Sequence, residues 1–181
     1  MATRTREPGG SLGAEAIRRL LLEGDSERWD ALCEVLLLYA ARRDHVRRLI
    51  EPTLARGEWV LCDRFADSTI AYQGYGRGLP LDDLRAVHRV SLGDFAPNLT
   101  LVLDLPVTAG LQRAALRSGR TDRFERLDQS FHERLHQGFL SIAAGEPDRC
   151  VLIDASGDID AVHLAIVAAV AMKLGVDIGP R

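Results

Sequence analysis

Hydrophobic residues fall into short continuous runs separated by longer amphipathic stretches. Three runs, rich in β-branched residues or leucine, predict strands at residues 59–62, 99–105 and 150–153. Nearly continuous hydrophobicity is typical of strands that are covered on both faces. The other stretches predict helices at residues 14–23, 29–54, 81–92, 107–116, 124–144 and 158–174. This alternation predicts an α/β fold, with a mostly parallel sheet and helices on both faces.

The length and composition indicate one globular domain spanning residues 1–181. No internal repeat, linker or low-complexity tract interrupts the chain. The net charge of −3 argues against bulk nucleic-acid binding, which requires a basic surface. No signal peptide precedes residue 11, and the apolar stretch at 161–174 is too short to span a bilayer. We therefore expect a cytoplasmic protein that binds neither nucleic acid nor membrane.

Arginine dominates the basic residues. Of the 23 lysines and arginines, Lys173 is the only lysine, so the other 22 are arginines. A planar guanidinium matches phosphate and carboxylate oxygens, which directs attention to anions. Arginine-rich codon usage in a GC-rich genome is an alternative explanation for most of them.

Polar segments follow the predicted strands, each of which ends in an aspartate, at Asp63, Asp104 and Asp154. Ligands of open α/β sheets bind beyond the carboxyl ends of the strands. After the first predicted strand, Asp63 and Arg64 are placed to address a phosphate. The residues that follow could hydrogen-bond and stack a base from one helical face: Ser68, Thr69, Tyr72 and Gln73. An ordinary capped helix before a glycine-rich turn is the alternative.

A second polar segment, Thr-Arg-Glu-Pro-Gly-Gly-Ser, occupies residues 5–11. Adjacent glycines let the backbone approach a ligand closely, although the segment could also be a simple turn before a helix. It is not a phosphate-binding loop, because the pattern GxxxxGK[ST] is absent. A match to the zinc-peptidase pattern HExxH at residues 132–136 has no convincing third ligand, so we interpret it as an exposed helix face.

Three motifs in register resemble thymidylate kinase of the bacterial type. They are TREPGG from residue 5, DRxxDS…AYQGxGRG from residue 63, and PxLTLxLD from residue 97. Matches at residues 36–42, 122–125 and 153–155 extend the resemblance over essentially the whole chain. The resemblance implies a P-loop NTPase-like α/β fold and transfer of the γ-phosphoryl group of ATP to dTMP, giving dTDP.

The resemblance also implies which residues contact dTMP. Arg64 lies on the phosphate side, and Tyr72 discriminates against a ribose hydroxyl by crowding. Leu38 replaces a phenylalanine that stacks on thymine in the family, at a loss of about 1 kcal/mol. The full set implied for dTMP is Arg6, Leu38, Arg42, Arg64, Ser68, Thr69, Tyr72 and Gln73.

Catalytic and ATP-side residues are implied in the same way. Arg117, with Arg113 one turn earlier, matches the catalytic arginine of a lid at about residues 113–126. Ala155 resembles the edge of the adenine pocket. Asp63 and Glu7 correspond to carboxylates that support Mg²⁺ through water, with no direct protein ligand. The resemblance also implies a homodimer.

The start of the chain departs from the family pattern. Family members open with a strand, a phosphate-binding loop with its lysine, and a helix before TREPGG, whereas Met1 lies just before Thr5. We therefore expect this chain to be inactive and poorly stable alone. The expected cause of the missing segment is a misplaced start codon or a truncated gene model. Two alternatives stay open: a non-catalytic remnant that binds dTMP, and a related deoxynucleoside kinase. Arg42 and Arg64 favour a nucleotide acceptor over a nucleoside.

Overall fold

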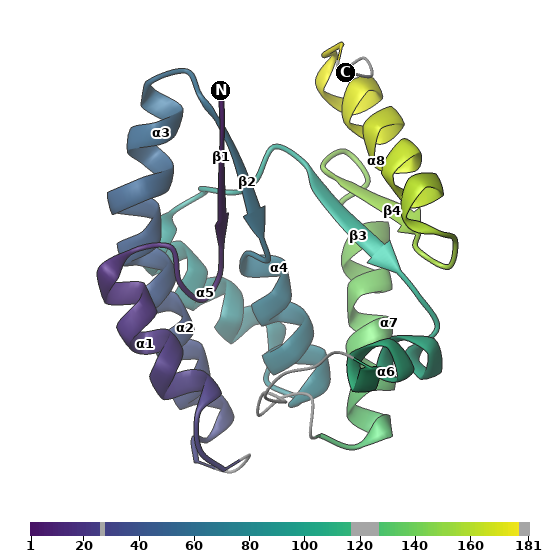
Figure 1. Ribbon diagram of the computed structural model, residues 1–181. Helices are drawn as coiled ribbons and strands as arrows, with labels where there is room; N and C mark the ends of the chain where they lie inside the picture. Colours follow the sequence, from purple (N-terminus) through teal and green to yellow (C-terminus); the bar gives the residue numbers. More distant parts are fainter. Residues whose placement is uncertain (26–27, 117–126, 178–181) are drawn as a thin grey trace. The chain divides into compact units, whose positions relative to one another are not determined.

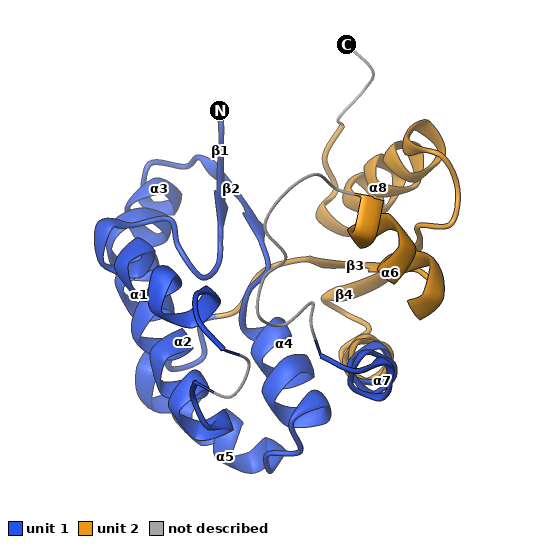
Figure 2. Cartoon of the chain, turned by 60° about the horizontal axis from the view of Figure 1, so that its bottom comes forward, with its two compact units in different colours: residues 1–95, 120–138 blue, residues 96–119, 139–181 orange. Residues whose placement is uncertain are grey.

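The computed structural model describes residues 1–25, 28–116 and 127–177. The chain forms two compact units, coloured separately in Figure 2. Unit 1 comprises Met1–Phe95 and Arg120–Gly138, and unit 2 comprises Ala96–Gly119 and Phe139–Arg181. A single domain over residues 1–181 stays a prediction.

Unit 1 contains a pair of parallel strands, β1 (Ala2–Arg6) and β2 (Trp59–Asp63) (Figure 1). The register pairs Ala2 with Trp59 and Arg6 with Asp63. β2 confirms the strand predicted at 59–62. β1 was not predicted, because the sequence Ala-Thr-Arg-Thr-Arg has no apolar run. Its β-branched threonines at alternate positions are nevertheless typical of a half-buried strand.

Helices make up the rest of unit 1. Residues 31–55 are helical throughout, and residues 66–76 follow β2 as a second helical run. Ser11 and Asp30 begin α1 and α2, each accepting a backbone N–H three residues ahead through its side chain. The elements are α1 (Leu12–Leu22), α2 (Ala31–His45), η1 (Val46–Ile50), α3 (Glu51–Ala55), α4 (Ala66–Thr69), η2 (Ile70–Gly76) and α5 (Leu81–Leu92).

The core of unit 1 forms where α2 packs against α1, α5 and η2. Tyr39 of α2 and Phe65, just after β2, belong to one buried cluster with Val35, Val46, Ile50, Leu84 and Leu92. Burial of a side chain of this size contributes about 1.5–3 kcal/mol. The cluster therefore anchors α2 and the segment after β2, both of which carry predicted site residues.

Unit 2 contains β3 (Thr100–Asp104) and β4 (Cys150–Asp154), again parallel. α6 (Val107–Leu116) follows β3, and α8 (Ile159–Leu174) packs against β4. α7 (Gln129–Gly145) begins in unit 1 and ends in unit 2. Within the described ranges, no helix is long and apolar enough to cross a membrane.

The structure confirms the α/β class, parallel strand pairing and the three predicted strands. The predicted bounds of α5 and α6 are reproduced residue for residue. The described strands pair two by two. Residues 124–126 of the helix predicted at 124–144 lie outside the described residues, and α7 begins at Gln129.

Candidate functional site

The parallel pairing of β1 and β2 brings two predicted motifs to one sheet edge. Arg6 lies opposite Asp63 in the register, and the Glu7 N–H donates to the Asp63 carbonyl at 2.9 Å. The TREPGG segment and the DRFADS segment therefore leave the strands side by side. This is the edge at which α/β sheets bind ligands.

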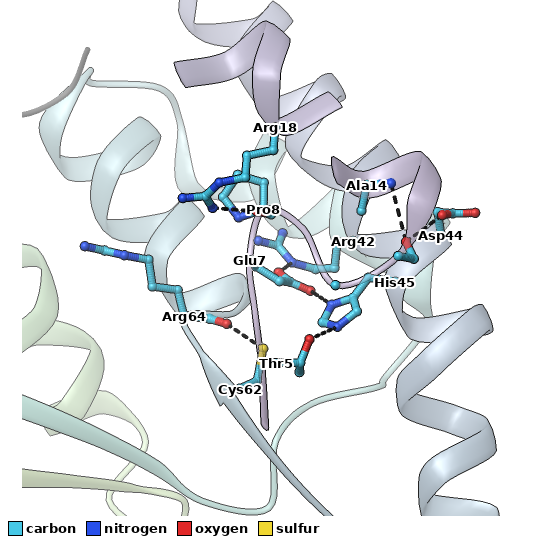
Figure 3. A network of polar contacts seen from close by, with 12 residues as sticks. Thr5, Glu7, Pro8, Ala14, Arg18, Arg42, Asp44, His45, Cys62 and Arg64 are labelled. Atoms are coloured by element: carbon cyan, nitrogen blue, oxygen red, sulfur yellow. Dashed lines mark hydrogen bonds and ion pairs between the residues drawn. The ribbon is translucent and has the colours of Figure 1, made fainter. Parts of the chain in front are cut away.

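A buried ion pair joins this edge to α2 (Figure 3). Arg42 Nε donates to Glu7 Oε2 at 2.6 Å, and Arg42 Nη2 donates to Thr69 Oγ1 at 3.0 Å. The Arg42 side chain is 2% exposed and that of Glu7 is 4% exposed. The Arg42 guanidinium also lies over the rings of Tyr39 and Phe65. A charge so desolvated needs such partners, and Arg42 is consequently held in one position.

His45 extends the network and was missed by the sequence analysis. Its Nδ1 lies 3.0 Å from Glu7 Oε1, and its Nε2 lies 2.8 Å from Thr5 Oγ1. Because a carboxylate only accepts, the Nδ1 atom carries the proton in this contact. The available signal was spacing: His45 follows Arg42 by three residues and so shares its helix face.

Gly10 allows the chain to pass close to this network. A Cβ atom at this position would lie 2.3 Å from His45 Nε2 and 2.5 Å from Thr5 Oγ1, and the φ angle is +87°. The Gly10 N–H also donates to Glu15 Oε1 at 3.1 Å. That hydrogen bond, aided by the charge of Arg6, lowers the pKa of the Glu15 carboxyl.

Replacing Gly10 with alanine should lower the free energy of unfolding by about 2 kcal/mol, because the methyl group collides with His45 in a strained backbone conformation. Denaturant unfolding measures the change. Gly57→Ala is the control: its φ angle is also positive, at +72°, but nothing lies within 4 Å of an added Cβ. If both variants lose the same stability, the close contact at Gly10 has no energetic role.

Arg64 adopts a conformation that is unusual for its residue type. Its φ angle is +69°, the left-handed region that favours glycine. The Cys62 thiol donates to the Arg64 carbonyl at 3.1 Å, and the exposed guanidinium lies 5.2 Å from the Tyr72 ring centroid. Stacking occupies the face of the guanidinium and leaves its N–H edge for an anion.

The predicted site residues of unit 1 line a common cavity. All the residues predicted for dTMP line it, together with Glu7 and Asp63. The lining residues that sequence analysis did not single out are Pro8, Arg18, Leu21, Leu22 and Phe65. Arg18 Nη1 donates to the Pro8 carbonyl at 2.7 Å, so it also holds the turn after β1.

The charges around the cavity favour an anion. The lining holds four arginines against two carboxylates, Glu7 and Asp63, and Glu7 is paired with Arg42. The arginines are Arg6, Arg18, Arg42 and Arg64. Two buried polar atoms in the lining, Arg42 Nη1 and Gln73 Oε1, have no hydrogen-bond partner among the described residues. Buried polar atoms without partners are rare, and here they offer one donor and one acceptor to a ligand.

The carboxylates at this edge differ in their fitness for Mg²⁺. Glu7, His45 and Cys62 place ligand atoms within 4.8 Å of one another. Both Glu7 oxygens are already engaged, and a cation there would face the Arg42 guanidinium. Burial, together with the Glu7 charge, raises the pKa of the Cys62 thiol to about 12, which disfavours the thiolate that a metal ligand requires. Asp63, which is exposed, suits a hydrated cation better.

Two predicted ATP-side residues meet in unit 2. Arg113 Nη1 donates to the Ala155 carbonyl at 3.1 Å, and Nη2 lies 3.5 Å from the Ser156 carbonyl. The Ala155 N–H donates to Asp104 at the end of β3. Arg117 and most of the predicted lid at 113–126 lie outside the described residues.

Comparison with known proteins agrees with this architecture. The sequence model of thymidylate kinase matches residues 1–166. The chain belongs to the thymidylate kinase family. It is 57% identical to the thymidylate kinase of Caulobacter vibrioides over 171 residues, which cover 94% of this chain and 82% of that protein. The thymidylate kinase of Nitrobacter hamburgensis is 54% identical over 168 residues, or 91% of this chain and 73% of that protein.

A crystal structure gives the same result for the fold. The thymidylate kinase of Ehrlichia chaffeensis superimposes with a TM-score of 0.74 at 34% sequence identity, covering 94% of this chain and 80% of that one. Membership makes the chain a nucleoside monophosphate kinase, a phosphotransferase whose substrates are dTMP and ATP. The resemblance seen in the sequence is thus confirmed.

Proposed function

We propose that the cavity of unit 1 binds dTMP as the acceptor of the γ-phosphoryl group of ATP, giving dTDP. The observation that carries the proposal is the buried Arg42, whose Nη1 atom has no partner among the described residues in a cavity lined by four arginines. Guanidinium donors match phosphate oxygens in charge and geometry. A neutral or cationic ligand would gain nothing from the exposed Arg64 guanidinium or from the unpartnered Nη1 of Arg42.

The two sides of the cavity suit the two parts of the nucleotide. We assign the phosphate to Arg64 and Arg42, with Arg6 at the exposed side. The base and deoxyribose would lie against side chains that combine apolar surface with hydrogen-bonding groups: Leu38, Ser68, Thr69, Tyr72 and Gln73. Pockets for nucleosides require this mixture, because the base has flat apolar faces and a polar edge.

Phosphoryl transfer needs positioning and charge neutralisation more than covalent chemistry by the protein. Arg113 and Arg117 would act on the ATP phosphates, and Ala155 would border the adenine. Mg²⁺, when bound with ATP, neutralises phosphate charge, and Asp63 would hold it through water. Glu7 contributes indirectly, because its carboxylate holds Arg42 and His45.

We also propose that the protein is a cytoplasmic homodimer. Apolar side chains on α2 and α5 are exposed in the single chain: Leu32 by 50%, Leu36 by 54% and Val90 by 90%. Large exposed apolar groups on neighbouring elements are typical of a subunit interface.

Isothermal titration calorimetry of the chain with dTMP and with thymidine tests the assignment. The two ligands share base and sugar, so the ratio of their affinities measures what the phosphate contributes to binding. We expect dTMP to bind at least about 100-fold more tightly, since hydrogen bonds to a charged group contribute about 1.5–3 kcal/mol each. Equal affinities would contradict a phosphate site and favour a nucleoside as the acceptor. No binding of either ligand would overturn the proposal.

A further inference from the structure

A fully buried acidic residue lies behind the cavity wall. Glu34 of α2 is 0% exposed and does not line the cavity. Its Oε2 accepts a hydrogen bond from Gln73 Nε2 at 3.0 Å, and its Oε1 accepts one from Arg77 Nη2 at 3.1 Å. The Arg77 charge offsets part of the cost of burying the carboxylate.

This contact fixes which way the Gln73 amide points. A carboxylate only accepts hydrogen bonds, so the NH₂ group of Gln73 must face Glu34. The flipped amide would set two acceptor oxygens about 3.0 Å apart, which is repulsive. In the observed orientation Gln73 Oε1 is a buried acceptor with no hydrogen-bond partner among the described residues.

We propose that Glu34 is a positioning residue that determines base specificity, by holding Gln73 so that its amide oxygen meets a base with an N–H donor. Thymine and uracil carry a proton on N3, whereas cytosine presents an acceptor there. The oriented amide therefore favours the imide bases over cytosine at the N3 position. This inference rests on the proposal that the cavity binds dTMP.

The test compares dUMP with dCMP, which share sugar, phosphate and the absence of a methyl group at C5. In the wild-type chain we expect calorimetry to show dUMP binding at least about tenfold more tightly than dCMP, the typical discrimination of an oriented amide. In Glu34→Gln, Arg77 only donates and therefore favours the oxygen of the new amide on its own side, so the new NH₂ group faces Gln73 and favours the turned-over Gln73 amide. The dUMP-to-dCMP ratio should then fall towards one, with dTMP affinity reduced only a few-fold.

Glu51→Gln serves as the matched control, because Glu51 is 37% exposed on α3 and pairs with Arg47 away from the cavity. It should retain the wild-type ratio. Thermal melts of both variants measure stability independently of nucleotide binding. A purely structural role for Glu34 would lower the melting temperature and weaken both nucleotides equally, leaving their ratio unchanged.

Should Glu34→Gln fail to fold, the nucleotide-free wild-type chain provides a second measurement. The side-chain amide signal of Gln73, identified by NMR through its loss in Gln73→Met, should include a proton protected from solvent exchange by Glu34. Free exchange of both protons would overturn the inference.

The outcomes separate the two proposals. If the wild type binds dUMP and dCMP equally, or Glu34→Gln keeps the wild-type ratio, the specificity role of Glu34 is wrong while the dTMP site stands. If the wild type binds no pyrimidine nucleotide, both proposals fall.

Discussion

Arg42→Met is expected to lower the free energy of unfolding by about 3–5 kcal/mol and to abolish dTMP binding. Removing one partner of a buried ion pair leaves the other charge desolvated, and among the described residues Glu7 would keep His45 as its side-chain partner. The same substitution removes the unpartnered Nη1 donor that we assign to the nucleotide. Denaturant unfolding and calorimetry with dTMP measure the two effects on one protein sample.

Two further variants separate the charge from the loss of the side chain. Arg43→Met changes the next residue on α2, which is exposed, and should alter stability by no more than about 0.5 kcal/mol. Adding Glu7→Gln to Arg42→Met removes the stranded charge and should restore part of the stability without restoring dTMP binding. A double variant no more stable than Arg42→Met alone would contradict the ion-pair explanation.

Arg64→Gly should reduce dTMP affinity by about 100-fold while the free energy of unfolding stays within about 1 kcal/mol of wild type. The lost guanidinium is exposed and stacks on Tyr72, so it contributes little to stability. Glycine also relieves the left-handed conformation at φ +69°. Affinity is measured by calorimetry and stability by urea unfolding.

Arg64→Ala is the informative companion, since alanine removes the same charge but retains the strained backbone. It should lose as much affinity as Arg64→Gly and be about 1 kcal/mol less stable. If either variant binds dTMP like the wild type, Arg64 does not contact the phosphate. If alanine and glycine are equally stable, the backbone at this position is not strained.

The sequence predicted elements whose hydrophobic pattern was strong. The continuous apolar runs gave β2, β3 and β4, and the periodic segments gave α5 and α6 with their observed bounds. β1 was not predicted, because its stability comes from pairing with β2 and not from apolar side chains of its own. The helical run through Pro52 continues to Ala55, with Pro52 in the first turn of α3, where proline costs no hydrogen bond.

The residues of the candidate site were also predicted only in part. Motif spacing brought Arg42, Arg64 and Gln73 to attention, and the structure places them around one cavity. The residues behind the cavity lining were not predicted. His45 contacts Glu7, 38 residues away in sequence, and Glu34 contacts Gln73, 39 residues away. Such contacts depend on tertiary packing: the spacing of His45 from Arg42 indicates a shared helix face, but it does not identify Glu7 as the partner.

A crystal structure of the chain with dTMP tests the central claim most directly. We predict that the phosphate lies against Arg64 and Arg42 Nη1, and that the base edge faces Gln73 Oε1. Both atoms that lack partners among the described residues would then be satisfied in one complex. Nucleotide density outside the cavity, or density within it that contacts neither Arg42 nor Arg64, would contradict the account.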